Sequence, residues 1–117
     1  MAIESAKWVS ALTTLGHRVN TVAGDGVADV ILPSLAIDAT TSTSIHEVAA
    51  AFDDADVVIV ENLASLPLNL DARDVVYHVL EGRRALFHHH DLPWQRPHIA
   101  HLEGPRVGPL WRHVTIN

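Results

Sequence analysis

The chain has 117 residues, of which 48% are hydrophobic and 19% are charged, and this composition is typical of one globular domain. Eight Lys and Arg stand against fourteen Asp and Glu, so the formal charge is -6, and no clustered basic surface indicates nucleic-acid binding. The absence of cysteine excludes disulfides, thiolate catalysis and Cys-based zinc sites. No apolar run approaches the roughly 20 residues of a transmembrane segment and no secretory signal is visible, so we expect a cytoplasmic chain.

The first third of the chain predicts a helix, a strand and an irregular segment. Residues 3–15 carry apolar side chains at helical spacing, and Gly16 follows where a left-handed residue would end the helix. Residues 18–23 are β-prone and end at a Gly-Asp-Gly turn. Residues 27–37 contain Pro33, which favours an irregular segment or an edge strand over a central one.

The remainder of the chain alternates helices and strands. Ser44 and Glu47 have the spacing of a capping box and predict a short helix, and a second helix ends at Gly82. Strands are predicted at residues 57–60, 85–90 and 113–117. The first of these is an uninterrupted β-branched run, typical of a strand covered on both faces. The alternation predicts an α/β fold of three layers, with a mostly parallel sheet and helices on both of its faces.

Polar residues follow two of these strands, at the sheet edge where ligands of open parallel sheets bind. Glu61 and Asn62 are either a turn pair or hydrogen-bonding groups for a polyhydroxylated ligand. Further along, Trp94 could stack on a sugar ring or cover the edge of the core. Arg96 could bind a phosphate or lie in solvent.

A run of three histidines ends the strand at residues 85–90. His88 and His90 are expected to point to the same face of the sheet, because side chains alternate along a strand. Two imidazoles at this spacing could share a zinc or copper ion, but a metal site also needs a third ligand and supporting hydrogen bonds. The alternative is that these histidines line a polar cleft or pair with nearby carboxylates. We therefore assign no metal ligand.

Three segments, residues 58–69, 87–97 and 111–117, carry a resemblance to a known family. They resemble the N-terminal domain of bacterial GT-B glycosyltransferases that use nucleotide-sugar donors, the retaining glycosyltransferase 4-like group. The most specific part is the sequence His-His-His-Asp-Leu-Pro-Trp-Gln-Arg-Pro, and residues 3–19 are similar to the first helix of that group and the strand after it. The resemblance implies that residues 1–117 form part of the acceptor-side Rossmann-like domain of a hexosyl-type transferase.

The resemblance also implies roles for individual residues. His90 matches the histidine of the His-Asp segment of the family, which lies in the cleft near the transferring sugar, and it is the expected catalytic residue. It would act by positioning a sugar hydroxyl more than by proton transfer. The expected substrate-binding residues are Glu61, Asn62, His88, Asp91, Trp94 and Arg96. No cofactor is implied.

Parts of the family pattern are missing from the chain. The first strand and its glycine-rich loop would precede Met1, and the second domain, which holds the nucleotide-sugar donor, would follow Asn117. We therefore expect a fragment that is inactive alone, whose partners in the complete enzyme are the donor, an acceptor and the C-terminal domain, and which exposes an apolar sheet edge. Two alternatives remain open: a stand-alone module that binds a sugar or nucleotide, and a small His-rich metal-binding protein.

Overall fold

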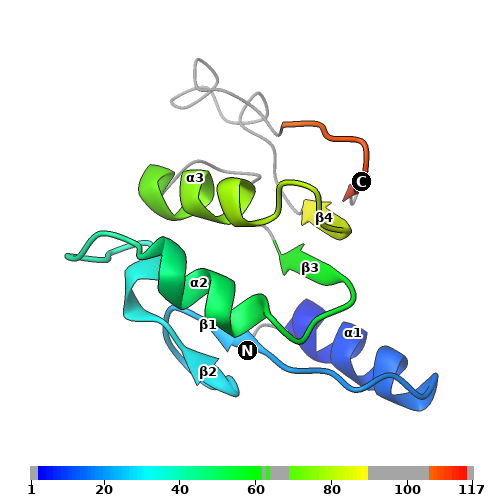
Figure 1. The fold of residues 1–117 in the computed structure, drawn as a ribbon. Helices are drawn as coiled ribbons and strands as arrows, with labels where there is room; N and C mark the ends of the chain where they lie inside the picture. Colours follow the sequence, from blue (N-terminus) through cyan, green and yellow to red (C-terminus); the bar gives the residue numbers. More distant parts are fainter. Residues whose placement is uncertain (1–2, 62, 64–68, 90–105, 116–117) are drawn as a thin grey trace.

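The computed structural model describes residues 3–61, 63, 69–89 and 106–115 of the chain (Figure 1). The elements are α1 (Ile3–Thr14), β1 (Val22–Ala23), β2 (Val30–Ile31), the 3₁₀ helix η1 (Pro33–Leu35), α2 (Ile45–Phe52), β3 (Val58–Glu61), α3 (Leu70–Val79), β4 (Ala85–His89) and β5 (Trp111–Thr115). Every described strand pair is parallel: β1 pairs with β2, and the other sheet has the order β3-β4-β5. The predicted α/β class is confirmed, and the arrangement is compatible with an incomplete Rossmann-like fold.

Local sequence signals set the ends of α1 and α2. Gly16 has a φ of 94°, and the N–H of His17 donates to the carbonyl of Leu12 at 3.0 Å, which confirms the predicted left-handed end of α1. At the start of α2, the side chain of Ser44 accepts a hydrogen bond from the N–H of Glu47 at 3.3 Å. The predicted helix after Ser44 is therefore confirmed.

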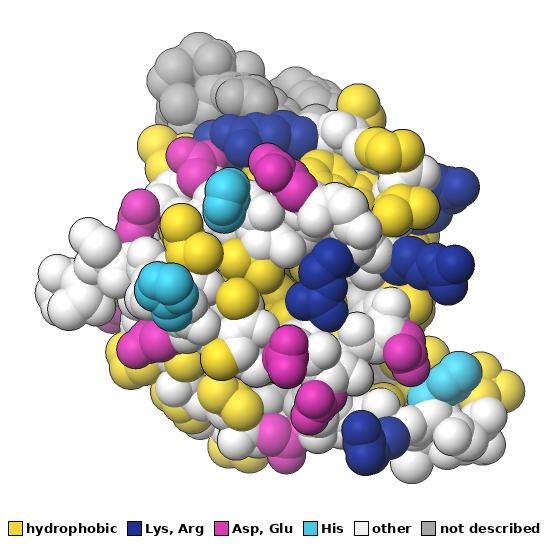
Figure 2. Space-filling model, in the orientation of Figure 1, with side chains coloured by type: hydrophobic (Ala, Val, Ile, Leu, Met, Phe, Trp, Pro, Cys, Tyr) yellow, Lys and Arg dark blue, Asp and Glu magenta, His cyan; other side chains and the backbone are white. Residues whose placement is uncertain are grey.

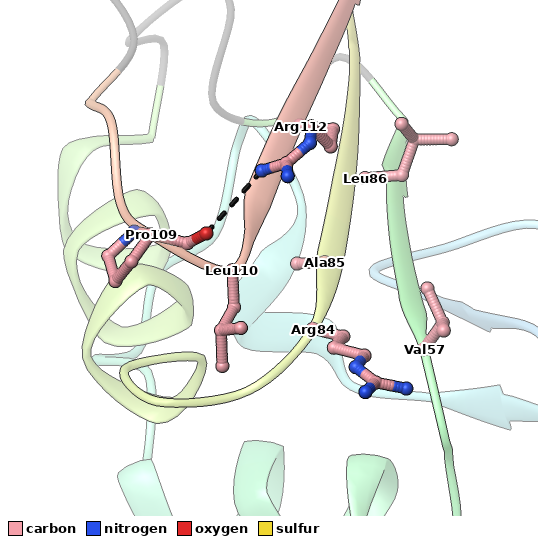
Figure 3. A pocket seen from close by; sticks show the side chains of 7 residues that line it. All are labelled: Val57, Arg84, Ala85, Leu86, Pro109, Leu110 and Arg112. Atoms are coloured by element: carbon pink, nitrogen blue, oxygen red, sulfur yellow. Dashed lines mark hydrogen bonds between the residues drawn. The ribbon is translucent and has the colours of Figure 1, made fainter.

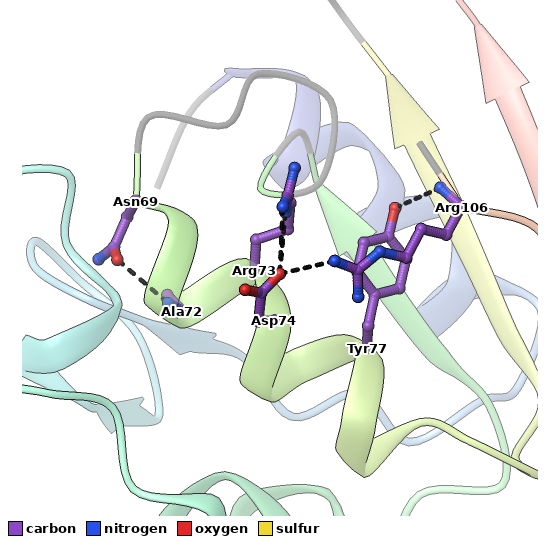
Figure 4. Close-up of polar contacts among 6 residues, drawn as sticks. All are labelled: Asn69, Ala72, Arg73, Asp74, Tyr77 and Arg106. Atoms are coloured by element: carbon purple, nitrogen blue, oxygen red, sulfur yellow. Dashed lines mark hydrogen bonds and ion pairs between the residues drawn. The ribbon is translucent and has the colours of Figure 1, made fainter. Parts of the chain in front are cut away.

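The start of α3 depends on Asn69, the residue directly before the helix. The side-chain oxygen of Asn69 accepts a hydrogen bond from the N–H of Ala72 at 3.1 Å (Figure 4). The side-chain amide of Asn69 donates to the carbonyls of Ser34 and Ala36 at 3.0 and 2.7 Å, which ties the helix start to the segment of η1. The helix ends before Gly82, which has a φ of 72°, as predicted.

The strands differ in extent from the prediction at three places. Only Val22–Ala23 of the predicted strand over residues 18–23 is formed, because its partner β2 is two residues long and is followed by Pro33 in η1. β3 begins one residue later than predicted, since Val57 is 50% exposed and precedes the ladder. β5 begins at Trp111 rather than residue 113, because Trp111 pairs with Ala85 of β4.

Helices contact both faces of the β3–β5 sheet. Phe87 and His88 of β4 point to opposite faces, because successive side chains of a strand alternate. On the core face, the ring of Tyr77 from α3 lies 5.4 Å from that of Phe87. On the opposite face, the ring of Trp8 from α1 lies 5.1 Å from that of His88. The expected covering of both faces by helices is therefore present in the described residues.

One apolar core lies between the sheet and the helices α2 and α3. Its buried members are Val48, Phe52, Val58, Val60, Val76, Tyr77, Leu80, Ala85 and Phe87. The indole N–H of Trp111 donates to the carbonyl of Leu80 at 3.1 Å, so the ring satisfies its polar atom while it packs on the core.

The segment before β5 is fixed to α3 by Arg106 (Figure 4). Its backbone N–H donates to the hydroxyl of Tyr77 at 2.9 Å, and its guanidinium lies 4.8 Å from the centre of the Tyr77 ring. The guanidinium also lies 2.9 Å from the carboxylate of Asp74, to which Arg73 is bonded at 3.1 Å. A cation over an aromatic ring and a shared carboxylate together hold this segment against the helix.

Replacing Gly24 with alanine is expected to lower the free energy of unfolding by about 1–3 kcal/mol, because an added methyl group would overlap neighbouring backbone. A Cβ at this position would lie 2.3 Å from the backbone nitrogen of Ala36 and 2.6 Å from its Cα. Urea denaturation followed by circular dichroism measures the change. Gly82→Ala is the control, since its Cβ meets nothing within 4 Å and only its positive φ is strained. A Gly24→Ala protein as stable as the parent would contradict the close approach.

Candidate functional site

Glu61 and His88 meet at the carboxyl ends of β3 and β4. The register places Glu61 beside His88, and Nδ1 of the imidazole lies 3.1 and 3.0 Å from the two carboxylate oxygens. The His88 side chain is 3% exposed and that of Glu61 is 23% exposed. The ring N–H therefore donates to a carboxylate that still reaches solvent. This pair occupies the sheet edge at which the sequence predicts ligand binding.

Trp8 of α1 completes this group of side chains. Its ring lies 5.1 Å from that of His88, at an interplanar angle of 55°. We call Glu61, His88 and Trp8 the carboxyl-edge cluster. No local pattern in the sequence signals the contact of Trp8 with His88, because the two residues come from elements far apart in the chain.

On the opposite, core-facing side of β4, two histidines contact each other. Nε2 of His89 lies 2.8 Å from Nδ1 of His113 in β5, and the two rings stack with centroids 5.1 Å apart. Burial lowers the pKa of His89 to about 4, with smaller contributions from the positive charges of His113 and His88. His89 is thus neutral near neutral pH. Sequence reasoning missed this pair, since it forms across two strands joined by a long connection.

The histidine at position 113 is packed between aromatic rings. Its ring stacks on Phe87 with centroids 5.1 Å apart and an interplanar angle of 16°. Its Nε2 is buried and has no hydrogen-bond partner among the residues that the structure describes. His89 is therefore buried and His113 partly buried, on the face of the sheet that carries Phe87.

The predicted site residues divide into two groups. Glu61 and His88 are brought together by the parallel register of β3 and β4. The other predicted site residues, Asn62, His90, Asp91, Trp94 and Arg96, lie outside the described residues. Their assignment stays a prediction. Over the described ranges, no three His, Asp or Glu side chains converge as a metal site would require.

A shallow hollow of about 400 Å³ lies at the other end of the sheet, near the amino ends of the strands (Figure 3). It is lined by Val57, Arg84, Ala85, Leu86, Pro109, Leu110 and Arg112. The guanidinium of Arg112 bonds the carbonyls of Pro109 and Trp111 at 3.4 and 3.0 Å, so it serves the local backbone. The hollow holds no carboxylate or imidazole and is separate from the carboxyl-edge cluster.

On the face shown in Figure 2, Lys and Arg side chains alternate with Asp and Glu, and no continuous basic area forms. In the described part of the chain, no helix is long and apolar enough to cross a membrane.

Comparison of the chain with protein-family models, with curated proteins and with solved structures found no match. We therefore infer function from the residues themselves and from the geometry of the carboxyl-edge cluster. That geometry combines a partly exposed carboxylate, an imidazole held by it and an indole ring.

Proposed function

We propose that this chain is the acceptor-side, Rossmann-like part of a nucleotide-sugar-dependent glycosyltransferase, and that it binds a sugar group at the carboxyl-edge cluster. The observation that supports this proposal is the Glu61–His88 pair at 3.0 Å, at the carboxyl ends of two adjacent parallel strands. Parallel α/β sheets bind their ligands at this edge. The proposal also draws on the resemblance of the segments around both residues to the glycosyltransferase 4-like group.

The chemistry of the cluster suits a polyhydroxylated ligand. A carboxylate has two oxygens with about four acceptor positions, so Glu61 can accept hydrogen bonds from sugar hydroxyls besides that from His88. The hydrogen bond from His88 fixes the orientation of both groups before a ligand arrives. The Trp8 indole supplies an apolar ring surface beside these polar atoms, the combination found in small-molecule sites.

In the complete enzyme, we assign His90 the catalytic role of positioning the transferring sugar and Asp91 the role of fixing its loop. Asn62, Trp94 and Arg96 would add substrate contacts, and the C-terminal domain would hold the donor. The present chain is expected to bind without catalysing transfer, since transfer needs both walls of the cleft.

Titration of the purified chain with UDP-glucose and GDP-mannose, and separately with UDP and glucose, tests the proposal by calorimetry or ligand-observed NMR. We expect at least one of the three hexose-containing compounds to bind through its hexose, and Glu61→Gln to weaken that binding by about tenfold or more, because a hydrogen bond to a charged group is worth about 1.5–3 kcal/mol. Glutamine keeps the shape of Glu61, so folding should be retained.

A matched control comes from an exposed pair of the same residue types. His78 and Glu81 at the end of α3 lie 4.0 Å apart with both side chains open to solvent. Replacing both with glutamine should leave binding unchanged. The proposal fails if no hexose-containing compound binds the parent chain, or if Glu61→Gln binds as tightly as the parent.

A further inference from the structure

The carboxylate of the carboxyl-edge cluster comes from the negatively charged part of the chain. No Lys or Arg occurs between residues 19 and 72, a segment that contains nine Asp and Glu, one of which is Glu61. All eight Lys and Arg lie in the rest of the chain, together with five Asp and Glu. The acidic segment forms β1, β2, α2 and β3. A surface dominated by one sign of charge attracts ligands of the opposite charge.

Five of the Arg side chains have other roles in the fold. Arg83 donates to two carbonyls in the turn before β3, at 2.7 and 3.0 Å. Arg84 and Arg112 line the hollow near the amino ends of the strands, at the other end of the sheet from the cluster. Arg73 and Arg106 bond to one carboxylate on α3, at 3.1 and 2.9 Å. Each of the five is therefore bonded to another group or lies at the other end of the sheet.

Trp8 adds a second attraction for a positive charge at the cluster. Its half-buried ring lies 5.1 Å from that of His88, which in turn bonds to Glu61. A cation beside an aromatic ring is attracted by the ring quadrupole, and Trp is the strongest partner among the aromatic side chains. Lys7 precedes Trp8 on α1, but successive residues of a helix point about 100° apart, and Lys7 is exposed. The carboxylate and the indole thus both favour a cation.

We propose that the carboxyl-edge cluster selects an acceptor sugar that carries an amino group and disfavours one that carries a carboxylate. The inference rests on the proposed sugar site and names the class of sugar. An ammonium group would donate to Glu61 with a charge on both partners, whereas a hydroxyl offers a neutral donor. A uronic acid would instead place a second carboxylate beside Glu61, which like-charge repulsion opposes.

Titration of the full chain with free monosaccharides tests the proposal by calorimetry or ligand-observed NMR. The ligands are glucose, glucosamine, 3-amino-3-deoxyglucose, 6-amino-6-deoxyglucose, N-acetylglucosamine and glucuronic acid. We expect at least one of the three amines to bind about fivefold or more tightly than glucose, because a partly exposed ion pair and a cation–π contact act together. N-acetylglucosamine keeps the nitrogen without its charge and should show no such gain. Glucuronic acid should bind more weakly than glucose.

Two variants with the same change in net charge locate the source of the preference. Glu61→Gln keeps the shape of the side chain and removes its charge, so the amine should lose most of its advantage over glucose, and glucuronic acid should no longer be disfavoured. Glu81→Gln removes a charge from the end of α3, where the side chain is 72% exposed, and should leave both preferences unchanged. A full amine preference in Glu61→Gln would overturn the proposal.

Salt gives an independent measurement on the parent chain, which decides the matter if Glu61→Gln binds too weakly to compare sugars. The Glu61 side chain is 23% exposed, so raising the salt from about 0.05 M to about 0.5 M should reduce the advantage of the amine and leave the affinity for glucose unchanged. Equal binding of glucose and all three amines would overturn the selectivity while the sugar site stands. Failure of every hexose to bind would remove both proposals.

Discussion

Replacing Phe87 with alanine is expected to lower the free energy of unfolding by about 4 kcal/mol, a large fraction of the roughly 5–15 kcal/mol that is typical of a folded domain. The side chain is fully buried in the middle of β4, and the rings of Tyr77, Trp111 and His113 lie 5.4, 5.2 and 5.1 Å from it. Alanine would leave a cavity that three rigid rings cannot fill. Thermal unfolding followed by circular dichroism should show a transition temperature lowered by more than about 10 °C.

Val114→Ala is the control for this substitution. Val114 lies on neighbouring β5 but is 37% exposed, so the loss of its methyl groups should cost well under the effect of Phe87→Ala. Equal destabilisation by the two variants would mean that the core is not centred on the face of β4 that carries Phe87.

Acidification is expected to destabilise the chain through His89. The folded-state pKa of His89 is about 4, below the ordinary value of 6.5, so the unfolded chain binds a proton at a higher pH than the folded chain does. This contribution is absent above the ordinary pKa, and stability is lost as the pH falls from there towards 4. The free energy of unfolding falls by about 2 kcal/mol near pH 5, and by roughly 3 kcal/mol once the pH is below both pKa values.

Urea denaturation near pH 7 and near pH 5 measures this effect. The useful quantity is the difference between the parent and His89→Gln, because effects of acid on the rest of the chain are common to both. Glutamine does not ionise and retains a polar group beside His113, so its stability should fall less on acidification. His78→Gln removes an exposed histidine and should behave like the parent. An identical acid response of the parent and His89→Gln would exclude this origin.

Features that depend on a few adjacent residues could be predicted from the sequence. The end of α1 at Gly16 and the start of α2 after Ser44 follow from backbone rules that act over one helical turn. The start of β5 at Trp111 could not be predicted in this way. It depends on pairing with Ala85 and on a hydrogen bond to Leu80, both distant in the sequence. The separation of the strands into two sheets is non-local for the same reason.

In the candidate site, the positions of residues at strand ends could be predicted, but contacts that depend on the arrangement of distant elements could not. Glu61 and His88 each follow from their position at the end of a strand, and parallel pairing then places them together. The bond between His89 and His113 could not be foreseen, because it requires the order of β4 and β5 in the sheet. The contact of Trp8 likewise depends on where α1 packs.

The attachment of Arg106 to α3 has a consequence for how the protein can diverge during evolution. The connection between β4 and β5 leaves the sheet after His89, which is bonded to His113, and returns at Arg106, which is bonded to Tyr77 and Asp74. Both ends are thus secured by contacts among residues that the structure describes. Substitutions that keep Tyr77 and Asp74 would therefore preserve the position of Arg106 on α3, and loss of either residue would weaken it.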